Sequence, residues 1–201
     1  TLEVSDKYNI GLEMRLFKRL NLSVDAYMDK RSKMPVSGSN VISSAIGISI
    51  PQQNNGKTEY KGIDLGIDWK DKVGKDFTYY VGGTLNYIRT EVIENGEGYI
   101  PYDYLSGKGL PDGQLFGLEA IGYFRDEADI ANSPQQMFSE VRPGDIKYKD
   151  MNGDRIIDDN DVHPIGHSSS VPEIYYGLKL GLEYKGFGLD ALFQGVAGYS
   201  R

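Results

Sequence analysis

The sequence is short of several residue types, and each shortage excludes a class of protein. It has 201 residues and no cysteine, so disulfide frameworks and thiolate chemistry are excluded. Its two histidines are too few for a zinc site or a catalytic constellation of defined spacing. A formal net charge of −7 lacks the basic excess that nucleic-acid binding needs, which excludes a nucleic-acid partner. No eighteen consecutive apolar residues occur, and serines interrupt even the most apolar stretch, 41–50, so the sequence predicts no membrane-spanning helix.

Glycine and tyrosine, by contrast, are abundant, at 25 and 15 residues. With a hydrophobic content of 39%, this composition favours an all-β fold with many turns over a helix bundle. Six segments alternate apolar and polar residues with period two, which is the signature of a strand with two unlike faces. They span residues 8–17, 22–31, 61–70, 77–92, 174–184 and 187–193.

The six segments recur as three pairs with tight turns inside each pair and long connections between pairs. The turns cover residues 18–21, 71–76 and 185–186, whereas the connections cover 32–60 and 93–172. This asymmetry predicts an antiparallel up-and-down meander of about six strands, with the long loops on one side. Inside the second connection, Ser133 followed by Pro134 predicts a short helix through Phe138.

The two faces of the predicted strands differ in a way that allows two architectures. The apolar stripes could pack inward in a soluble sandwich, or face lipid in an outer-membrane barrel whose polar rows line a lumen. Aromatic residues on the apolar face, close to the tight turns, favour the barrel because such rings form interfacial girdles: Trp69, Tyr79, Tyr184 and Phe187. Six strands cannot close a membrane barrel. The chain also begins without methionine and ends within a strand pattern, so we expect a piece of a longer protein.

A twelve-residue acidic segment, 150–161, has the ligand spacing of a calcium loop. Oxygen-bearing residues fall at positions 1, 3, 5, 9 and 12, and the carbonyl of position 7 completes the predicted ligand set: Asp150, Asn152, Asp154, Ile156, Asp158 and Asp161. Arg155 departs from the pattern, because position 6 is usually a glycine with positive φ. Calcium would be structural here, and the alternative is a solvated turn rich in Asp and Asn. Ile157 is predicted to pack inward in either case.

No nucleophile, base or phosphate-binding motif surrounds the candidate residues. The serines at 168–170 lack an elbow or triad pattern, and the glycines at 107, 109 and 113 follow no strand and open no helix. The sequence therefore predicts that this chain is not an enzyme.

Several short motifs nevertheless carry family information. They are the run Val-Arg-Pro-Gly-Asp-Ile-Lys-Tyr-Lys-Asp at 141–150, Asn-Gly-Asp at 152–154, Pro-Ile-Gly at 164–166, Pro-Glu-Ile-Tyr-Tyr-Gly at 172–177, Tyr-Lys-Gly-Phe at 184–187, Phe-Gln-Gly at 193–195 and Gly-Tyr-Phe at 122–124. Together they resemble the barrels of SusC/RagA-type TonB-dependent transporters. The similarity is strongest from Val141 to Gly195, and it covers most of the chain.

The resemblance implies an outer-membrane importer of Bacteroidota with a 22-stranded barrel, an N-terminal plug, a segment that contacts TonB and a SusD-like surface lipoprotein as a lid. Residues 1–201 would be part of the barrel domain, without the plug, and would contribute wall and loops to the uptake of glycan fragments or peptides. The long loops would face outward, the short turns would face the periplasm, and lipid would contact the apolar face. The alternative is a secreted, calcium-stapled β-sandwich that binds carbohydrate.

Overall fold

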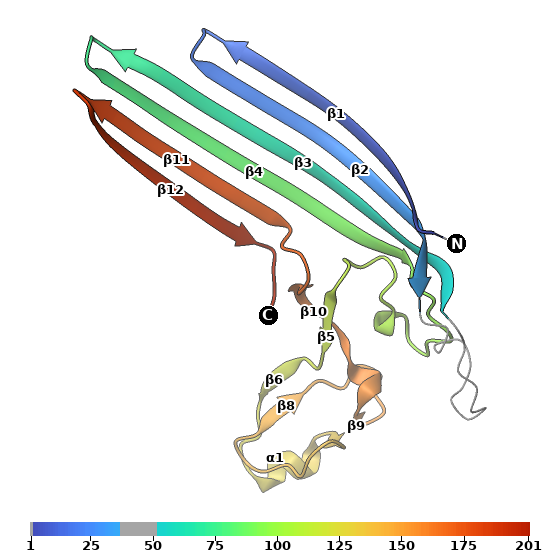
Figure 1. Cartoon of the computed structure of the whole chain (residues 1–201). Coiled ribbons are helices and arrows are strands. Elements are labelled where there is room, and N and C mark those ends of the chain that lie inside the picture. Colours follow the sequence, from blue (N-terminus) through green and yellow to red (C-terminus); the bar gives the residue numbers. More distant parts are fainter. Residues whose placement is uncertain (1, 37–51) are drawn as a thin grey trace.

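The computed structural model describes residues 2–36 and 52–201 and consists mainly of one antiparallel sheet (Figure 1). The sheet has the order β1-β2-β3-β4-β11-β12, so each strand pairs with its predecessor except that β11 joins β4 after a long excursion. The strands are β1 (Val4–Leu16), β2 (Leu20–Val36), β3 (Gln53–Val73), β4 (Phe77–Glu94), β11 (Ile174–Tyr184) and β12 (Phe187–Ala197). The predicted all-β meander of six strands is confirmed.

Three tight turns lie together at one end of the sheet (Figure 1). Lys185 and Gly186 both have positive φ, as a two-residue type I′ hairpin requires, and Tyr184 pairs directly with Phe187. Phe17 and Lys18 have φ of 55° and 56° in the turn between β1 and β2, and Gly74 has φ of 66° in the turn between β3 and β4. Left-handed residues thus let the chain reverse within two or three residues.

Strands β2, β3 and β4 extend beyond their predicted limits at the opposite end of the sheet. There both faces carry polar side chains, so the sequence loses the apolar alternation that marked the strands, although backbone pairing continues. Irregular register after Arg31, with Lys33 at φ 56°, bends this part of β2. The connection between β2 and β3 is therefore shorter than predicted, and the apolar stretch 41–50 lies outside the described residues.

The excursion from β4 to β11 folds into three small sheets beside the loop-side end of the main sheet (Figure 1). β10 pairs with β5, β6 with β8 and β7 with β9. Backbone hydrogen bonds join the excursion to β4 of the main sheet. The Val92 N–H donates to the Leu110 carbonyl at 2.9 Å, and the Ile88 N–H donates to the Glu173 carbonyl at 2.8 Å. Its elements are η3 (Asp103–Leu105), β5 (Gln114–Gly117), β6 (Ala120–Tyr123), α1 (Glu127–Asn132), β7 (Gln135–Gln136), β8 (Ile146–Tyr148), β9 (Ile156–Ile157), η4 (Asp159–Asp161) and β10 (His163–Ser168).

The short helix predicted from Ser133 to Phe138 is wrong in position. The helix is α1, which ends where the predicted one was to begin: Ser133 is its C-cap, in extended backbone. Pro134 disfavours helical backbone at the residue before it, so it closes a helix more readily than it opens one here. Asp126 is the actual N-cap, and its carboxylate accepts the Asp129 N–H at 2.7 Å.

The buried core lies in the excursion and not beneath the sheet. Among the described residues, only Phe124 and Ile157 are buried hydrophobics, and Ile157 is fully buried as predicted. The apolar stripes of the sheet stay uncovered, with Ile67 49% and Leu182 48% exposed. No second sheet packs on this face within residues 2–36 and 52–201, which rules out the β-sandwich alternative for the described structure.

Candidate functional site

The outer face of the sheet is a continuous apolar band, because the register aligns the stripes of all six strands. One row across the sheet illustrates the band; it comprises Met14, Leu22, Ile67, Gly83, Leu178 and Phe193. On β3 the band lies between Lys61 and Asp71, which are ten residues apart. That is about 33 Å along an extended strand and about 23 Å across a membrane at a tilt of about 45°. The band therefore has the height of the apolar belt of outer-membrane barrels, about 25 Å.

Aromatic side chains edge this band at the side of the tight turns. The Trp69 indole N–H donates to the Tyr79 hydroxyl at 3.3 Å, and Tyr79 stacks with Phe77 at a centroid distance of 6.1 Å. Tyr184 pairs with both Phe77 and Phe187, and Phe187 is 83% exposed. The predicted girdle residues thus lie together at the turn-side edge of the apolar band.

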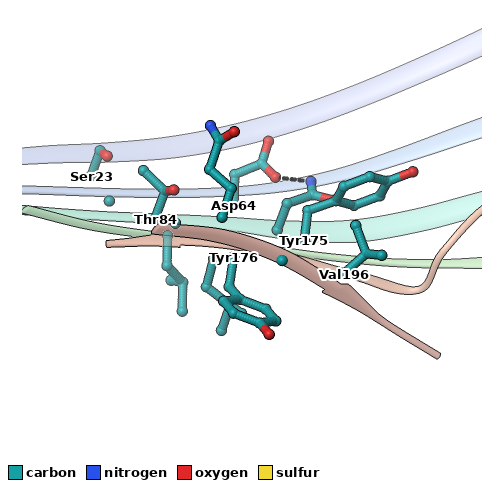
Figure 2. A pocket seen from close by; sticks show the side chains of 13 residues that line it. Ser23, Asp64, Thr84, Tyr175, Tyr176 and Val196 are labelled. Carbon is teal, nitrogen blue, oxygen red and sulfur yellow. Dashed lines mark hydrogen bonds between the residues drawn. The ribbon is translucent and has the colours of Figure 1, made fainter. Parts of the chain in front are cut away.

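The inner face is polar, and a hollow of about 710 Å³ lies at its central part, with Leu65, Leu85 and Tyr176 of the apolar face also contributing to the lining. Figure 2 shows the hollow from close by. The Asn86 amide links two strands there, because it donates to the Asp64 carboxylate and, at 3.3 Å, to the Tyr27 hydroxyl. Figure 2 shows Asp64 and Tyr175 on one side of the sheet and Tyr176 on the other. The polar lining of the hollow contains hydroxyl, amide and carboxylate groups but no lysine or arginine. These polar residues are Ser23, Asp64, Thr84, Asn86, Tyr175 and Gln194.

Glycines on the inner face let large side chains lie flat on the wall. The Tyr27 ring covers Gly62, and the Tyr80 ring covers Gly181, so that any Cβ at either glycine would clash with the ring. The Tyr80 hydroxyl also donates to the Asp190 carboxylate on β12. Aromatic rings thereby shield strand backbone that glycine leaves bare.

Comparison with known proteins agrees with a barrel sheet that has one apolar and one polar face. The model of the family described as TonB dependent receptor-like, beta-barrel matches residues 2–198. The chain belongs to this family. It is part of the barrel of an outer-membrane protein, which confirms the predicted family and localisation.

Curated relatives of this TonB-dependent receptor-like chain come from Formosa agariphila. TonB-dependent receptor P39 is 27% identical over 96% of the chain, and TonB-dependent receptor P3 is 24% identical over 98% of it. The matches cover 22% and 20% of those proteins, so the chain spans about a fifth of the length of the curated relatives it matches. The six strands are accordingly one sector of a larger barrel.

Solved structures support the same fold. The RagAB peptide importer in its closed-closed state aligns with 98% of the chain and 21% of its own, at a TM-score of 0.70 and 22% identity. The RagAB peptide importer in its open-open state aligns with 97% of the chain and 20% of its own, at a TM-score of 0.71 and 21% identity. At these identities the likeness establishes the fold of this TonB-dependent receptor-like segment.

The predicted calcium ligands lie in one loop of the excursion, held by hydrogen bonds within the loop. The Asp150 carboxylate accepts the N–H groups of Gly153 and Arg155, at 2.6 and 2.9 Å. The Asp161 carboxylate is fully buried and accepts the N–H groups of Met151 and Asp158, at 2.7 and 2.9 Å.

The loop fits the calcium pattern in its backbone and less well in its closing ligand. Arg155 has φ of 68°, so position 6 makes the left-handed turn that the pattern requires. The oxygens of Asp161, however, are both engaged by backbone donors. In the described part of the chain, no group of three or more His, Cys, Asp and Glu side chains is arranged to hold a metal ion. Calcium binding stays a prediction.

Neighbouring side chains fix this loop to the rest of the excursion. The Tyr104 hydroxyl donates to the Asn160 carbonyl at 2.6 Å, and its ring stacks on Tyr102 at a centroid distance of 5.3 Å. His163 follows the loop and lies 3.6 Å from the Glu119 carboxylate, which also pairs with Lys149 at 2.8 Å. This hydrogen bond from Lys149 lowers the pKa of Glu119. Farther along the chain, the His167 backbone N–H donates to the Ser200 hydroxyl at 2.8 Å.

No helix in the described residues is long and apolar enough to cross a membrane.

Proposed function

We propose that this chain forms a sector of the wall of a TonB-dependent importer that takes up glycan fragments or peptides. The observation that carries the proposal is the division of the sheet into an uncovered apolar face and a hydrogen-bonded polar face. The apolar face contacts lipid, and the polar face borders the aqueous path of the substrate. Peptide uptake is named for the RagAB importer, whose fold the chain shares.

The same proposal assigns the loops and partners. The excursion at 95–173 faces outward and contacts a SusD-like surface lipoprotein, while TonB acts through parts of the protein beyond this wall. The loop at 150–161, with calcium as a structural ion, stiffens the excursion and so reduces the ordering cost of docking a partner. The chain itself catalyses no reaction, since its role is to bind and to separate lipid from water.

Two adjacent tyrosines provide the test. Figure 2 shows Tyr175 on the polar side of the sheet and Tyr176 on the apolar side, although both residues contribute to the rim of the hollow. Their exposed fractions are similar, at 40% and 51%. In the whole transporter, Tyr175→Ala should lower substrate uptake several-fold, because a contact in the aqueous path is lost. Tyr176→Ala removes the same group from the other face and should leave uptake per inserted barrel unchanged.

Uptake of radiolabelled oligosaccharide or peptide by cells, normalised to the amount of folded barrel, measures both variants. Equal loss of uptake in the two variants would contradict the assignment of the faces. Unchanged uptake in both would remove Tyr175 from the substrate path.

A further inference from the structure

The outer face carries a cationic row immediately beyond the loop-side end of the apolar band. Lys61 of β3 and Arg89 of β4 lie directly opposite each other in the register, and both side chains share the face of Ile63 and Tyr87. Tyr8 and Met28 continue the row across β1 and β2. Two positive charges therefore lie at the level where the apolar band ends.

Acidic groups lie one row farther from the band. The Glu59 carboxylate forms ion pairs with the ammonium groups of Lys61 and Lys30, at 2.5 and 3.2 Å. Glu91 lies opposite Glu59 in the register. Asp6 pairs with Lys30 in the same outer row. Lys61 and Arg89 thus lie one row nearer the band than Glu59, Glu91 and Asp6, while Lys30 lies in the row of the carboxylates.

Arg89 has no ion pair among the described residues, and it is exposed. Like charges directly opposite each other on a sheet face destabilise the pairing unless an anion lies between them. Lys61 is paired with Glu59, so Arg89 is the exposed cation of the two whose hydrogen-bond donors are left for an external anion. A guanidinium binds phosphate with two parallel hydrogen bonds, and an adjacent ammonium adds a second charge.

We propose that Lys61 and Arg89 bind the phosphate of a lipid headgroup in the leaflet on the loop side of the barrel. The adjoining band supplies the contact for the acyl chains. Tyr8 lies in the cationic row and Tyr87 lies one row nearer the band, at the depth where interfacial aromatic residues gather. A lipid would contact both the cationic pair and the apolar band, whereas free phosphate would contact only the cationic pair. The inference rests on the lipid-facing assignment of the outer face and is independent of which substrate passes through the lumen.

The test uses the whole transporter in detergent and two lipids with identical acyl chains. Phosphatidic acid carries the phosphate, and diacylglycerol lacks it. Native mass spectrometry should show retention of phosphatidic acid over diacylglycerol by the wild-type protein. K61Q/R89Q should weaken retention of phosphatidic acid about twenty-fivefold, at roughly fivefold for each cation near a charged membrane surface.

A control removes the same number of positive charges from the inner face. K70Q/K179Q removes two lysines that face the lumen and should leave lipid retention unchanged. Glu91→Gln removes a repelling anion and should increase retention. Retention of phosphatidic acid by K61Q/R89Q at the wild-type level, equal binding of diacylglycerol, or equal loss in the control would each overturn the proposal. Displacement of the lipid by millimolar inorganic phosphate would instead reveal a site for free anions and would also overturn it.

The outcomes separate this inference from the proposed transport function. Loss of lipid retention with normal uptake would support the headgroup site alone. Failure of the Tyr175→Ala test with normal lipid retention would count against the lumen assignment and leave the headgroup site standing.

Discussion

At the scale of single residues, the loop at 150–161 makes the left-handed turn of a calcium loop although position 6 is not glycine. Arg155 adopts a φ of 68°, a conformation that costs a non-glycine residue energy, and its N–H donates to the Asp150 carboxylate at 2.9 Å. The turn is thus held by hydrogen bonds from inside the loop. Side-chain oxygens at the ligand positions serve the same turn, since Asp154 accepts the Ile156 N–H at 2.8 Å.

Calcium binding at this loop is tested with Asp154→Ala. We expect calcium to raise the Tm of the wild-type protein, because a ligand that binds the folded state stabilises it, by about 2.7 kcal/mol at a concentration one hundred times Kd. The variant lacks a predicted ligand, and calcium should leave its Tm unmoved. Differential scanning calorimetry with and without calcium measures the shift. Equal shifts in both proteins would remove the proposed site.

At the scale of elements, helix α1 is held in place by one carboxylate. The Asp129 carboxylate accepts a hydrogen bond from the Lys147 ammonium group of β8 at 3.0 Å. It also accepts hydrogen bonds from the backbone N–H and the guanidinium group of Arg125, at 3.2 and 3.3 Å. The hydrogen bond from Lys147 is the largest cause that lowers the pKa of Asp129 to about 2, followed by the Arg125 N–H. A six-residue helix is too short to be stable alone, so this tie to β8 positions it.

The lowered pKa predicts how the stability of α1 depends on pH. A carboxyl with a pKa of about 2 in the folded state and 3.8 as the ordinary value stabilises the fold fully above about pH 4. That contribution is lost as the pH falls through about 2. Hydrogen exchange of the α1 amides should therefore accelerate between pH 4 and pH 2 in the wild-type protein, beyond the intrinsic change of exchange with pH.

Three variants check the cause. Asp129→Asn should show weaker protection at pH 5 and no further acid-dependent loss. Lys147→Met should behave similarly, whereas Arg125→Met should change protection less, since the Arg125 side chain is 82% exposed and contributes less. An acid-dependent loss that persists in Asp129→Asn would show that another group titrates.

At the scale of the whole molecule, the same charge has opposite consequences on the two faces. Leu178 faces outward in the apolar band and is 41% exposed, and the next residue along β11, Lys179, faces the lumen at nearly the same depth. Leu178→Lys should destabilise the inserted barrel by about 2–4 kcal/mol, the cost of a lysine near the midplane of the lipid face.

Guanidinium unfolding of the whole barrel in lipid vesicles measures this effect. Thr84→Lys is the matched control, because Thr84 lies on the polar face opposite Gly177 and its lysine would face water. We expect this control to change stability by less than about 1 kcal/mol. Equal destabilisation by the two substitutions would mean that the faces do not differ in their surroundings.

Much of the fold could be predicted from the sequence, because a strand with one apolar face has an apolar residue at every second position. The apolar stripes, the tight turn at Lys185 and Gly186, the girdle residue Trp69 and the inward position of Ile157 are all local consequences of alternation, turn chemistry and loop spacing. The acidic loop was equally visible, since its residues are consecutive. The helix was placed wrongly because Ser133 and Pro134 fit the start of one helix as well as the end of another.

Only the tertiary structure decided what lies beside what. The pairing of β11 with β4 brings Tyr175 beside Asn86 across 79 residues of connection, and no local pattern records such a contact. The register likewise placed Lys61 opposite Arg89 and laid the Tyr27 ring on Gly62. By itself the sequence determined that the strands have two unlike faces. The direction in which those faces point was decided by the sheet, because burial depends on what covers a side chain, and here nothing in the described chain covers the apolar one.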